Sequence, residues 1–180
     1  MSETSNTSSV NVSTEATRFF QHWRWLGLGV LVLILDRVTK YVVVSEMAYG
    51  DRIQILPFFA WVRWHNPGAA FSFLADAGGW QRWFFIVLGV GFCIYLFWEF
   101  VRLRQNEKML ACIYALILGG ALGNLWGRIV EGYVVDFVLV HYENYIFPAF
   151  NVADSALFCG VALWMILIFQ EYRAQKSPVA

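Results

Sequence analysis

Four long runs of apolar residues separate shorter polar stretches along the chain. They cover residues 25–44, 83–101, 109–130 and 150–169. Each run is close to the ~20 residues that an α-helix needs to cross the hydrocarbon core of a bilayer. Spanning segments of this kind form helices because lipid offers no partner to an exposed backbone N–H or C=O. The pattern therefore predicts an all-α membrane protein with four transmembrane helices.

The stretch between the first two runs has a different period. Residues 52–56 (Arg-Ile-Gln-Ile-Leu) alternate polar and apolar side chains, and residues 60–64 (Ala-Trp-Val-Arg-Trp) are aromatic and β-prone. Residues 137–142 are a third candidate strand. Period-two alternation favours strands, so we expect a small β-cradle and surface loops that hold an extended peptide by strand addition. The alternative is an aromatic anchor at the headgroups, built from Trp61, Trp64, Trp80 and Trp83.

Basic residues predict the orientation in the membrane, because cytoplasmic loops are enriched in Lys and Arg. One side carries Arg18, Arg24, Arg102, Arg104, Lys108, Arg173 and Lys176. The other side carries Arg52, Arg63 and Arg82. We therefore expect both termini and the 102–108 loop in the cytoplasm. The loops at 45–82 and 131–149, which hold the β-cradle, face outward.

Polar segments flank the predicted spans. Residues 1–17 are rich in Ser, Thr and Asn, and their few apolar groups cannot form a core, so we expect a disordered tail. They also lack the pattern of a secretory signal. Residues 18–173 make up the predicted four-span domain, and residues 174–180 a C-terminal cytoplasmic tail.

Composition supports the membrane assignment and excludes some partners. Hydrophobic residues make up 59% and charged residues 14%, against about 45–50% and about 25% in soluble domains. The 13 basic and 13 acidic residues balance, so nothing indicates a nucleic-acid partner. Cys93, Cys112 and Cys159 lie singly in apolar runs, which favours packing over a disulfide or zinc site.

Several polar residues interrupt the apolar runs, where each needs a partner or a role. They are Asp36 and Lys40 in the first run, Asn124 and Arg128 in the third, Asp136 just after it, and Asn151 and Asp154 at the start of the fourth. Asp36 and Lys40 are four residues apart and can pair on one helix face. In the predicted orientation all seven side chains lie at one outer level, so we predict a shared polar pocket that opens outward.

Small residues in the third run predict close helix packing. One stripe consists of Gly119, Gly123 and Gly127, and the neighbouring stripe of Gly120, Asn124 and Arg128. Small residues four apart let helix backbones approach closely. We therefore expect the first stripe to pack and the second to present polar groups to the pocket.

Asp136 and Asp154 are a candidate catalytic pair. Two neighbouring carboxyl groups cannot both stay ionised, so they share a proton. Such a pair activates water, since one carboxylate takes the water proton while the other, protonated, polarises a carbonyl. Two alternatives stay open. Asp154 follows Asn151 by three residues, the spacing of a capping box, and paired acids in membranes also serve proton relays.

Other catalytic arrangements find less support. The sequence has no Gly-x-Ser-x-Gly nucleophile elbow and no His-Glu-x-x-His metal motif, and His22, His65 and His141 are divided between the two sides. Ser45 follows Lys40 by five residues, which places the two on different helix faces. We expect neither a metal nor a cofactor.

Four motifs in order resemble bacterial lipoprotein signal peptidase, also called signal peptidase II. They are residues 36–40 (Asp-Arg-Val-Thr-Lys), 66–71 (Asn-Pro-Gly-Ala-Ala-Phe), 119–128 (Gly-Gly-Ala-Leu-Gly-Asn-Leu-Trp-Gly-Arg) with 134–137 (Val-Val-Asp-Phe), and 150–155 (Phe-Asn-Val-Ala-Asp-Ser). The resemblance extends over nearly everything after the N-terminal tail.

The resemblance implies an aspartyl protease of the bacterial inner membrane, with its active site facing the periplasm. It cuts the signal peptide from prolipoproteins, just before a cysteine that carries diacylglycerol. The catalytic pair maps by motif onto Asp136 and Asp154. Supporting or substrate-binding roles map onto Asp36, Lys40, Asn66, Gly68, Asn124, Arg128 and Asn151. The implied partners are lipid-modified prolipoproteins and membrane lipid, and we expect a monomer without metal.

Two further expectations come from the resemblance. A flap is expected near residues 68–78. The residue before the motif arginine is often aspartate in the family, whereas here it is Gly127. Because that acid is absent, we expect Arg128 to bind Asp36, Asp136 or a backbone carbonyl.

Two other functions are weighed against this one. A proton-coupled small transporter would use Asp36, Lys40, Asp136 and Asp154 as a relay, but it predicts acids at mid-depth and interrupted helices. A non-catalytic scaffold that binds lipid or a partner helix would tolerate loss of either aspartate's charge.

Overall fold

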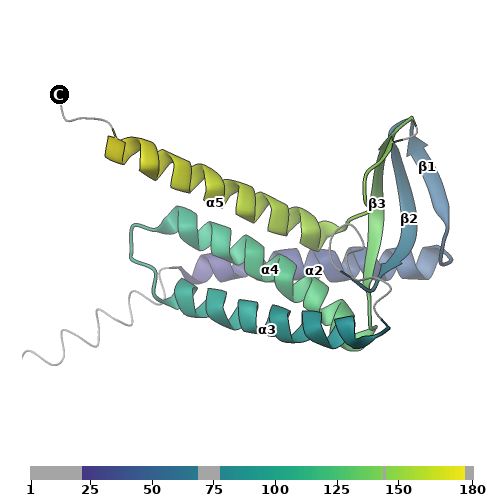
Figure 1. Cartoon of the computed structure of the whole chain (residues 1–180), viewed down its shortest axis with the longest axis horizontal. Coiled ribbons are helices and arrows are strands. Elements are labelled where there is room, and N and C mark those ends of the chain that lie inside the picture. Colours follow the sequence, from purple (N-terminus) through teal and green to yellow (C-terminus); the bar gives the residue numbers. More distant parts are fainter. Residues whose placement is uncertain (1–21, 69–77, 144, 177–180) are drawn as a thin grey trace, which may run out of the picture.

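The computed structural model describes residues 22–68, 78–143 and 145–176. Its elements are α2 (Trp23–Glu46), β1 (Arg52–Leu56), β2 (Phe59–Asn66), α3 (Trp80–Val101), α4 (Lys108–Val130), β3 (Val134–Tyr142), β4 (Tyr145–Ile146) and α5 (Val152–Lys176). Four long helices form a bundle, and the strands cover one end of it (Figure 1). The N-terminal tail at 1–17 and most of the expected flap lie outside the described residues.

Each of the four predicted apolar runs forms a helix. Within the described residues, α3, α4 and α5 are long and apolar enough to cross a membrane. Helix α2 has similar length but carries more charge, from Arg24, Asp36, Arg37, Lys40 and Glu46. The outline of a mostly helical protein with a small antiparallel sheet is therefore confirmed.

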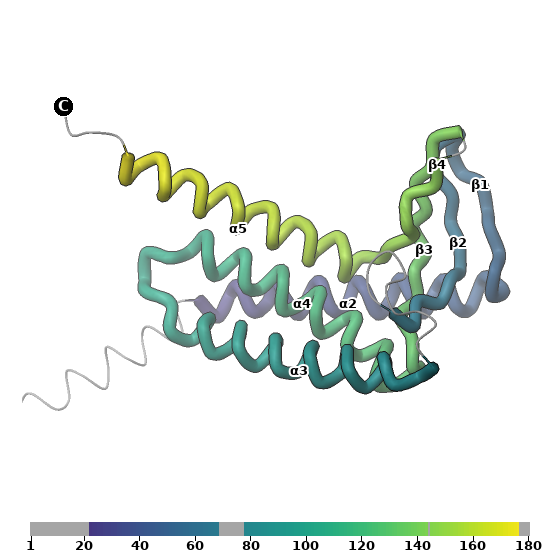
Figure 2. Tube along the Cα trace, viewed as in Figure 1, coloured from purple at the N-terminus to yellow at the C-terminus, as the bar shows by residue number. Residues whose placement is uncertain are grey.

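Helix α4 lies between the other three helices and packs against each of them. A Cβ atom built on Gly119 would lie 2.5 Å from the Gly29 carbonyl oxygen of α2. A Cβ on Gly120 would collide with the Ala153 carbonyl of α5. Both predicted stripes therefore take part in packing, and Gly120 belongs to the seam with α5. The tube in Figure 2 shows α5 diverging from α4 toward its C-terminal end.

The sheet has the order β1-β2-β3-β4, and all its neighbours are antiparallel. Its strands run across the end of the bundle (Figure 1). Strand β3 begins at Val134 rather than at the predicted residue 137, because Val134 and Val135 pair with Asn66 and His65 of β2. This extension places Asp136 on a strand, opposite Trp64.

Two of the three arginines predicted to face outward cap helices. Arg63 of β2 donates from Nη1 to the carbonyl of Met47, at the end of α2, over 2.7 Å. Arg82 of α3 donates to the carbonyls of Arg128 and Ile129, at the end of α4, over 2.8 Å each. Such contacts satisfy carbonyls that have no partner within the helix. These contacts tie the sheet and α3 to the C-terminal ends of α2 and α4.

Candidate active site

The predicted pair of Asp36 and Lys40 is buried where α2 meets α4 and the start of α5. Lys40 Nζ donates to Asp36 Oδ2 over 2.9 Å, and both residues are at most 1% exposed. The other carboxylate oxygen, Asp36 Oδ1, accepts the backbone N–H of Ala153 over 3.0 Å. Buried charges need such partners. The pair therefore ties α2 to the start of α5, one residue before Asp154.

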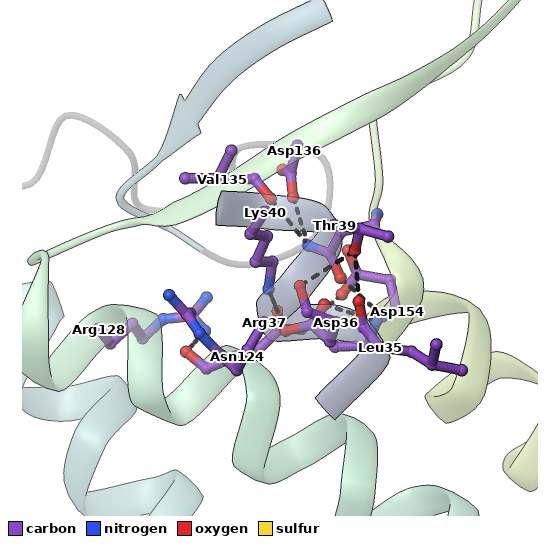
Figure 3. Close-up of polar contacts among 12 residues, drawn as sticks. Leu35, Asp36, Arg37, Thr39, Lys40, Asn124, Arg128, Val135, Asp136 and Asp154 are labelled. Carbon is purple, nitrogen blue, oxygen red and sulfur yellow. Dashed lines mark hydrogen bonds and ion pairs between the residues drawn. The ribbon is translucent and has the colours of Figure 1, made fainter. Parts of the chain in front are cut away.

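Asn124 of α4 continues this network toward Asp154. Its Oδ1 accepts from Lys40 Nζ over 3.0 Å, and its Nδ2 donates to Asp154 Oδ1 over 2.6 Å. One amide therefore uses its acceptor on α2 and its donor on α5. Figure 3 shows these side chains converging beneath β3.

Asn151 and Asp154 form the capping box that their spacing predicts. The backbone N–H of Asp154 donates to Asn151 Oδ1 over 3.0 Å, and that of Asn151 donates to Asp154 Oδ2 over 3.2 Å. The box starts α5 and fixes the direction of the Asp154 carboxylate. A capping role and a catalytic role are compatible, because the capping box uses only Oδ2 of Asp154. The other oxygen, Oδ1, lies outside the box and accepts from Asn124.

Asp136 approaches the same network from the sheet. Its Oδ1 accepts from Asn151 Nδ2 over 2.7 Å, and its Oδ2 accepts from Asn66 Nδ2 over 3.1 Å. Asn151 therefore contacts both aspartates, one with its side chain amide and the other through the capping box. The prediction that Asp136 and Asp154 share one site is consistent with this geometry.

The environment of Asp136 favours its neutral form. Asp136 is 4% exposed. Burial raises the pKa of its carboxyl from 3.8 to about 7, and the nearby charge of Asp154 acts in the same direction. The donors Asn66 and Asn151 and the charge of Lys40 oppose this increase. A carboxyl with such a pKa carries a proton for a large fraction of the time near neutral pH.

Arg128 binds backbone carbonyls, one of the three options expected for it. Its Nη2 donates to the Gly68 carbonyl over 2.6 Å, and its Nη1 reaches the Asn124 carbonyl at 3.3 Å. The N–H of Gly68 donates in turn to Asn66 Oδ1 over 3.0 Å. Gly68 is therefore held from both sides, by the residue that binds Asp136 and by Arg128.

A cavity of about 670 Å³ opens onto the two aspartates. Five of the nine predicted site residues line it, namely Asn66, Asn124, Arg128, Asp136 and Asp154. The other four, Asp36, Lys40, Gly68 and Asn151, hold these five by the contacts described above. The cavity also has an apolar wall that sequence reasoning missed, made of Phe147, Pro148, Phe150, Leu157 and Phe158. A polar centre beside an apolar wall suits a substrate with both peptide and hydrocarbon parts.

The family model described as signal peptidase (SPase) II matches residues 28–170. The chain belongs to the signal peptidase II family. A lipoprotein signal peptidase of Acinetobacter baumannii (strain SDF) is 52% identical over 158 residues, which cover 87% of this chain and 89% of the relative. One of Ectopseudomonas mendocina (strain ymp) is 45% identical over 165 residues, which cover 91% and 97%.

Solved structures agree with this membership. A bacterial membrane enzyme determined by the in meso method at 2.3 Å resolution matches with a TM-score of 0.77 and 32% identity, over 87% of this chain and 93% of that chain. A second, at 1.9 Å resolution, matches with a TM-score of 0.71 and 34% identity, over 81% and 92%. This member of the signal peptidase II family is therefore a protease with the fold of a multi-pass membrane enzyme, and the transporter alternative is not favoured.

Proposed function

We propose that this protein is an aspartyl endopeptidase that removes the signal peptide from diacylglyceryl-modified prolipoproteins. It cuts before the lipidated cysteine, and Asp136 and Asp154 are its catalytic pair. The proposal depends on one observation. Asn151 donates hydrogen bonds to the carboxyl groups of both aspartates, which line the same cavity. Membership of the signal peptidase II family supplies the substrate class.

The two carboxyl groups take different roles in the proposed mechanism. Asp136 holds the shared proton, because it is buried on β3 and its pKa is raised to about 7. Asp154 carries the negative charge, because the pair shares one proton and Asp136 holds it; Asn124 and the N–H of Asn151 donate to the two oxygens of Asp154. Hydrogen bonds donated to a carboxylate favour its ionised form.

Hydrolysis then follows from these protonation states. Asp154 takes a proton from a water molecule as the water oxygen attacks the scissile carbonyl. Asp136 donates a hydrogen bond to that carbonyl oxygen, where negative charge develops. Collapse of the tetrahedral intermediate breaks the C–N bond, and the leaving nitrogen takes up the proton held by Asp154. Lys40 and Asn124 keep the Asp154 carboxylate in place during these steps.

We further propose that α2 is a fourth span. Its charged residues Asp36 and Lys40 are at most 1% exposed and paired, so they add little polar surface toward lipid. Its exposed face carries large apolar residues, namely Val30, Leu31, Ile34, Leu35, Val38 and Val42. Residues 18–173 then form one peptidase domain in the inner membrane, with both termini cytoplasmic and the sheet and site facing the periplasm.

The apolar wall of the cavity fits the lipid of the proposed substrate. Phe147, Leu157 and Phe158 line the cavity that holds the aspartates, and Phe158 is 76% exposed. We infer that the diacylglyceryl chains enter sideways from the bilayer past these side chains. The signal helix packs against the spans, which brings the scissile amide to Asp136 and Asp154.

Cleavage of matched precursors tests the proposal. The purified protein in detergent is given one precursor with a diacylglyceryl cysteine and another of identical sequence with a free cysteine, and products are identified by mass spectrometry. We expect a single cut before the lipidated cysteine and far slower cleavage without the lipid. Equal cleavage of both would refute the lipid requirement, and cleavage of neither would refute the peptidase assignment.

A further inference from the structure

Arg37 joins α2 to the turn between α4 and β3. Its Nη2 donates to Glu131 Oε1 over 2.6 Å, and the two side chains are 25% and 26% exposed. Glu131 is the C-cap residue of α4, and its N–H donates to the Gly127 carbonyl over 2.8 Å. The ion pair therefore links α2 to the C-terminal end of α4.

This turn leads directly into the strand that carries Asp136. Gly132 has a φ of +89°, a conformation that favours glycine. Strand β3 begins two residues later, at Val134. The ring of Tyr133 stacks on His65 of β2 with 3.8 Å between the ring centroids. Asp136 follows Glu131 by five positions, so its place in the cavity depends on where the turn is held.

Neighbouring residues on α2 serve the two segments that carry the aspartates. Asp36 accepts the N–H of Ala153, which directly precedes Asp154. Arg37 binds Glu131, which lies shortly before Asp136. One turn of α2 therefore contacts both segments, and it constrains the placement of one carboxyl group relative to the other.

The carboxylate of Glu131 compensates the positive charge of Arg37. Arg37 Nη1 is buried and has no hydrogen-bond partner within the described residues. A Cβ atom built on Gly127 would lie 3.9 Å from this nitrogen, but also 2.9 Å from the Tyr133 carbonyl oxygen. A side chain at 127 would thus crowd the turn. Glycine there leaves room for Tyr133, while the acid that faces Arg37 comes from position 131.

We propose that Arg37 is a positioning residue for Asp136 and acts through its ion pair with Glu131. The inference rests on the proposed function, since it assumes that Asp136 belongs to the catalytic pair. A small displacement of a reacting group lowers turnover steeply, by as much as ~100-fold for 1 Å. Loss of the ion pair frees the turn, and Asp136 then occupies its catalytic position for a smaller fraction of the time.

A double-mutant cycle tests this proposal with the lipidated precursor as substrate. The variants are Arg37→Gln, Glu131→Gln and the double variant. Arg102→Gln serves as the control, because Arg102 is an exposed residue at the C-terminal end of α3, at the end of the bundle opposite the sheet (Figure 1). We expect each single variant to lower kcat about tenfold with little change in KM, since the substrate contacts are intact. The double variant should be no slower than either single one, because both remove the same interaction.

The pH profile separates positioning from a general loss of stability. The charged groups around Asp136 are Asp154 of α5, Lys40 of α2 and Arg128 of α4. A freed Asp136 is better solvated and farther from Asp154, so its pKa falls. The alkaline limb of the pH profile of kcat should therefore move to lower pH in both single variants and stay unchanged in Arg102→Gln.

Two results would overturn the proposal: single variants with wild-type kcat and pH profile, or losses that multiply in the double variant. In either case cleavage by the wild type leaves the proposed function intact, whereas an inactive wild type would refute that function instead. If Arg37→Gln does not fold, kcat and the pH profile of Glu131→Gln test the proposal without the cycle. Glu131→Gln keeps the size of the side chain and an oxygen acceptor, so it provides the charge-removal arm in any case.

Discussion

The raised pKa of Asp136 makes the wild type less stable at alkaline pH than an otherwise identical protein without this carboxyl. The carboxyl has a pKa of about 7 in the folded protein, against 3.8 without its surroundings. The folded state therefore binds more protons than the unfolded state between these values, and stability falls as pH rises through that window. Asp136→Asn removes this dependence because Asn does not titrate.

The expected size of the effect follows from the width of the window. Each pH unit inside it changes the free energy of unfolding by about 1.4 kcal/mol. Between pH 5 and pH 8 the wild type should lose about 3 kcal/mol relative to Asp136→Asn, and the difference should level off above pH 7. For a chain of this size, 1 kcal/mol shifts Tm by about 2–4 °C, so the Tm difference should change by about 6–12 °C.

Thermal unfolding in detergent measures this difference, with fluorescence of the nine tryptophans as the signal. Asn has one oxygen acceptor where Asp has two, so its amide nitrogen meets a donor from Asn66 or Asn151. That mismatch offsets the whole curve by a constant amount and leaves its slope with pH unchanged. If the Tm curves of the wild type and Asp136→Asn run parallel from pH 5 to pH 8, Asp136 is not a buried carboxyl with a raised pKa, and this prediction is refuted.

Two further predictions concern the packing of the bundle. Lys40→Met should lower the free energy of unfolding by about 3–5 kcal/mol in chemical denaturation, because it leaves the Asp36 carboxylate buried without its cation; adding Asp36→Asn should recover much of the loss, and no recovery would contradict the pair. Gly119→Ala should destabilise the fold by about 1–3 kcal/mol, because the new Cβ atom meets the Gly29 carbonyl. A Cβ atom on Gly91 would have no neighbour within 4 Å, so Gly91→Ala should not destabilise the fold. Equal effects of the two substitutions would contradict the close packing of α4 against α2 at Gly119.

The helices, and the common depth of the polar residues in the site, could be predicted from short-range sequence patterns. Run length alone indicated each helix, and the charge bias of the loops brought Asp36, Asn124 and Asp154 to the same depth. The i,i+4 spacing of Asp36 and Lys40 and the i,i+3 spacing of Asn151 and Asp154 also correspond to observed contacts. These features depend on a few neighbouring residues and on helix geometry, which the sequence specifies directly.

The remaining contacts depend on how distant segments meet. Nothing near Asn66 in the sequence indicates that its amide binds Asp136, 70 positions later. The family resemblance indicates only a supporting or substrate-binding role for Asn66. The contact between Arg128 and Gly68 spans 60 positions. Arg37 has no role assigned from its motif, because its partner Glu131 lies 94 positions away, in the turn after α4. Such pairs appear only once the sheet is placed over the end of the bundle.

The most direct test of the account is turnover of a diacylglyceryl-modified precursor by purified wild type, Asp136→Asn and Asp154→Asn in detergent. Asn keeps the size of each side chain but can neither hold the shared proton nor act as a base. We predict that both variants fold, as judged by their unfolding transitions, and that both lose turnover. Near-wild-type turnover by either folded variant would contradict the catalytic pair and leave that aspartate with a structural role, such as the cap of α5.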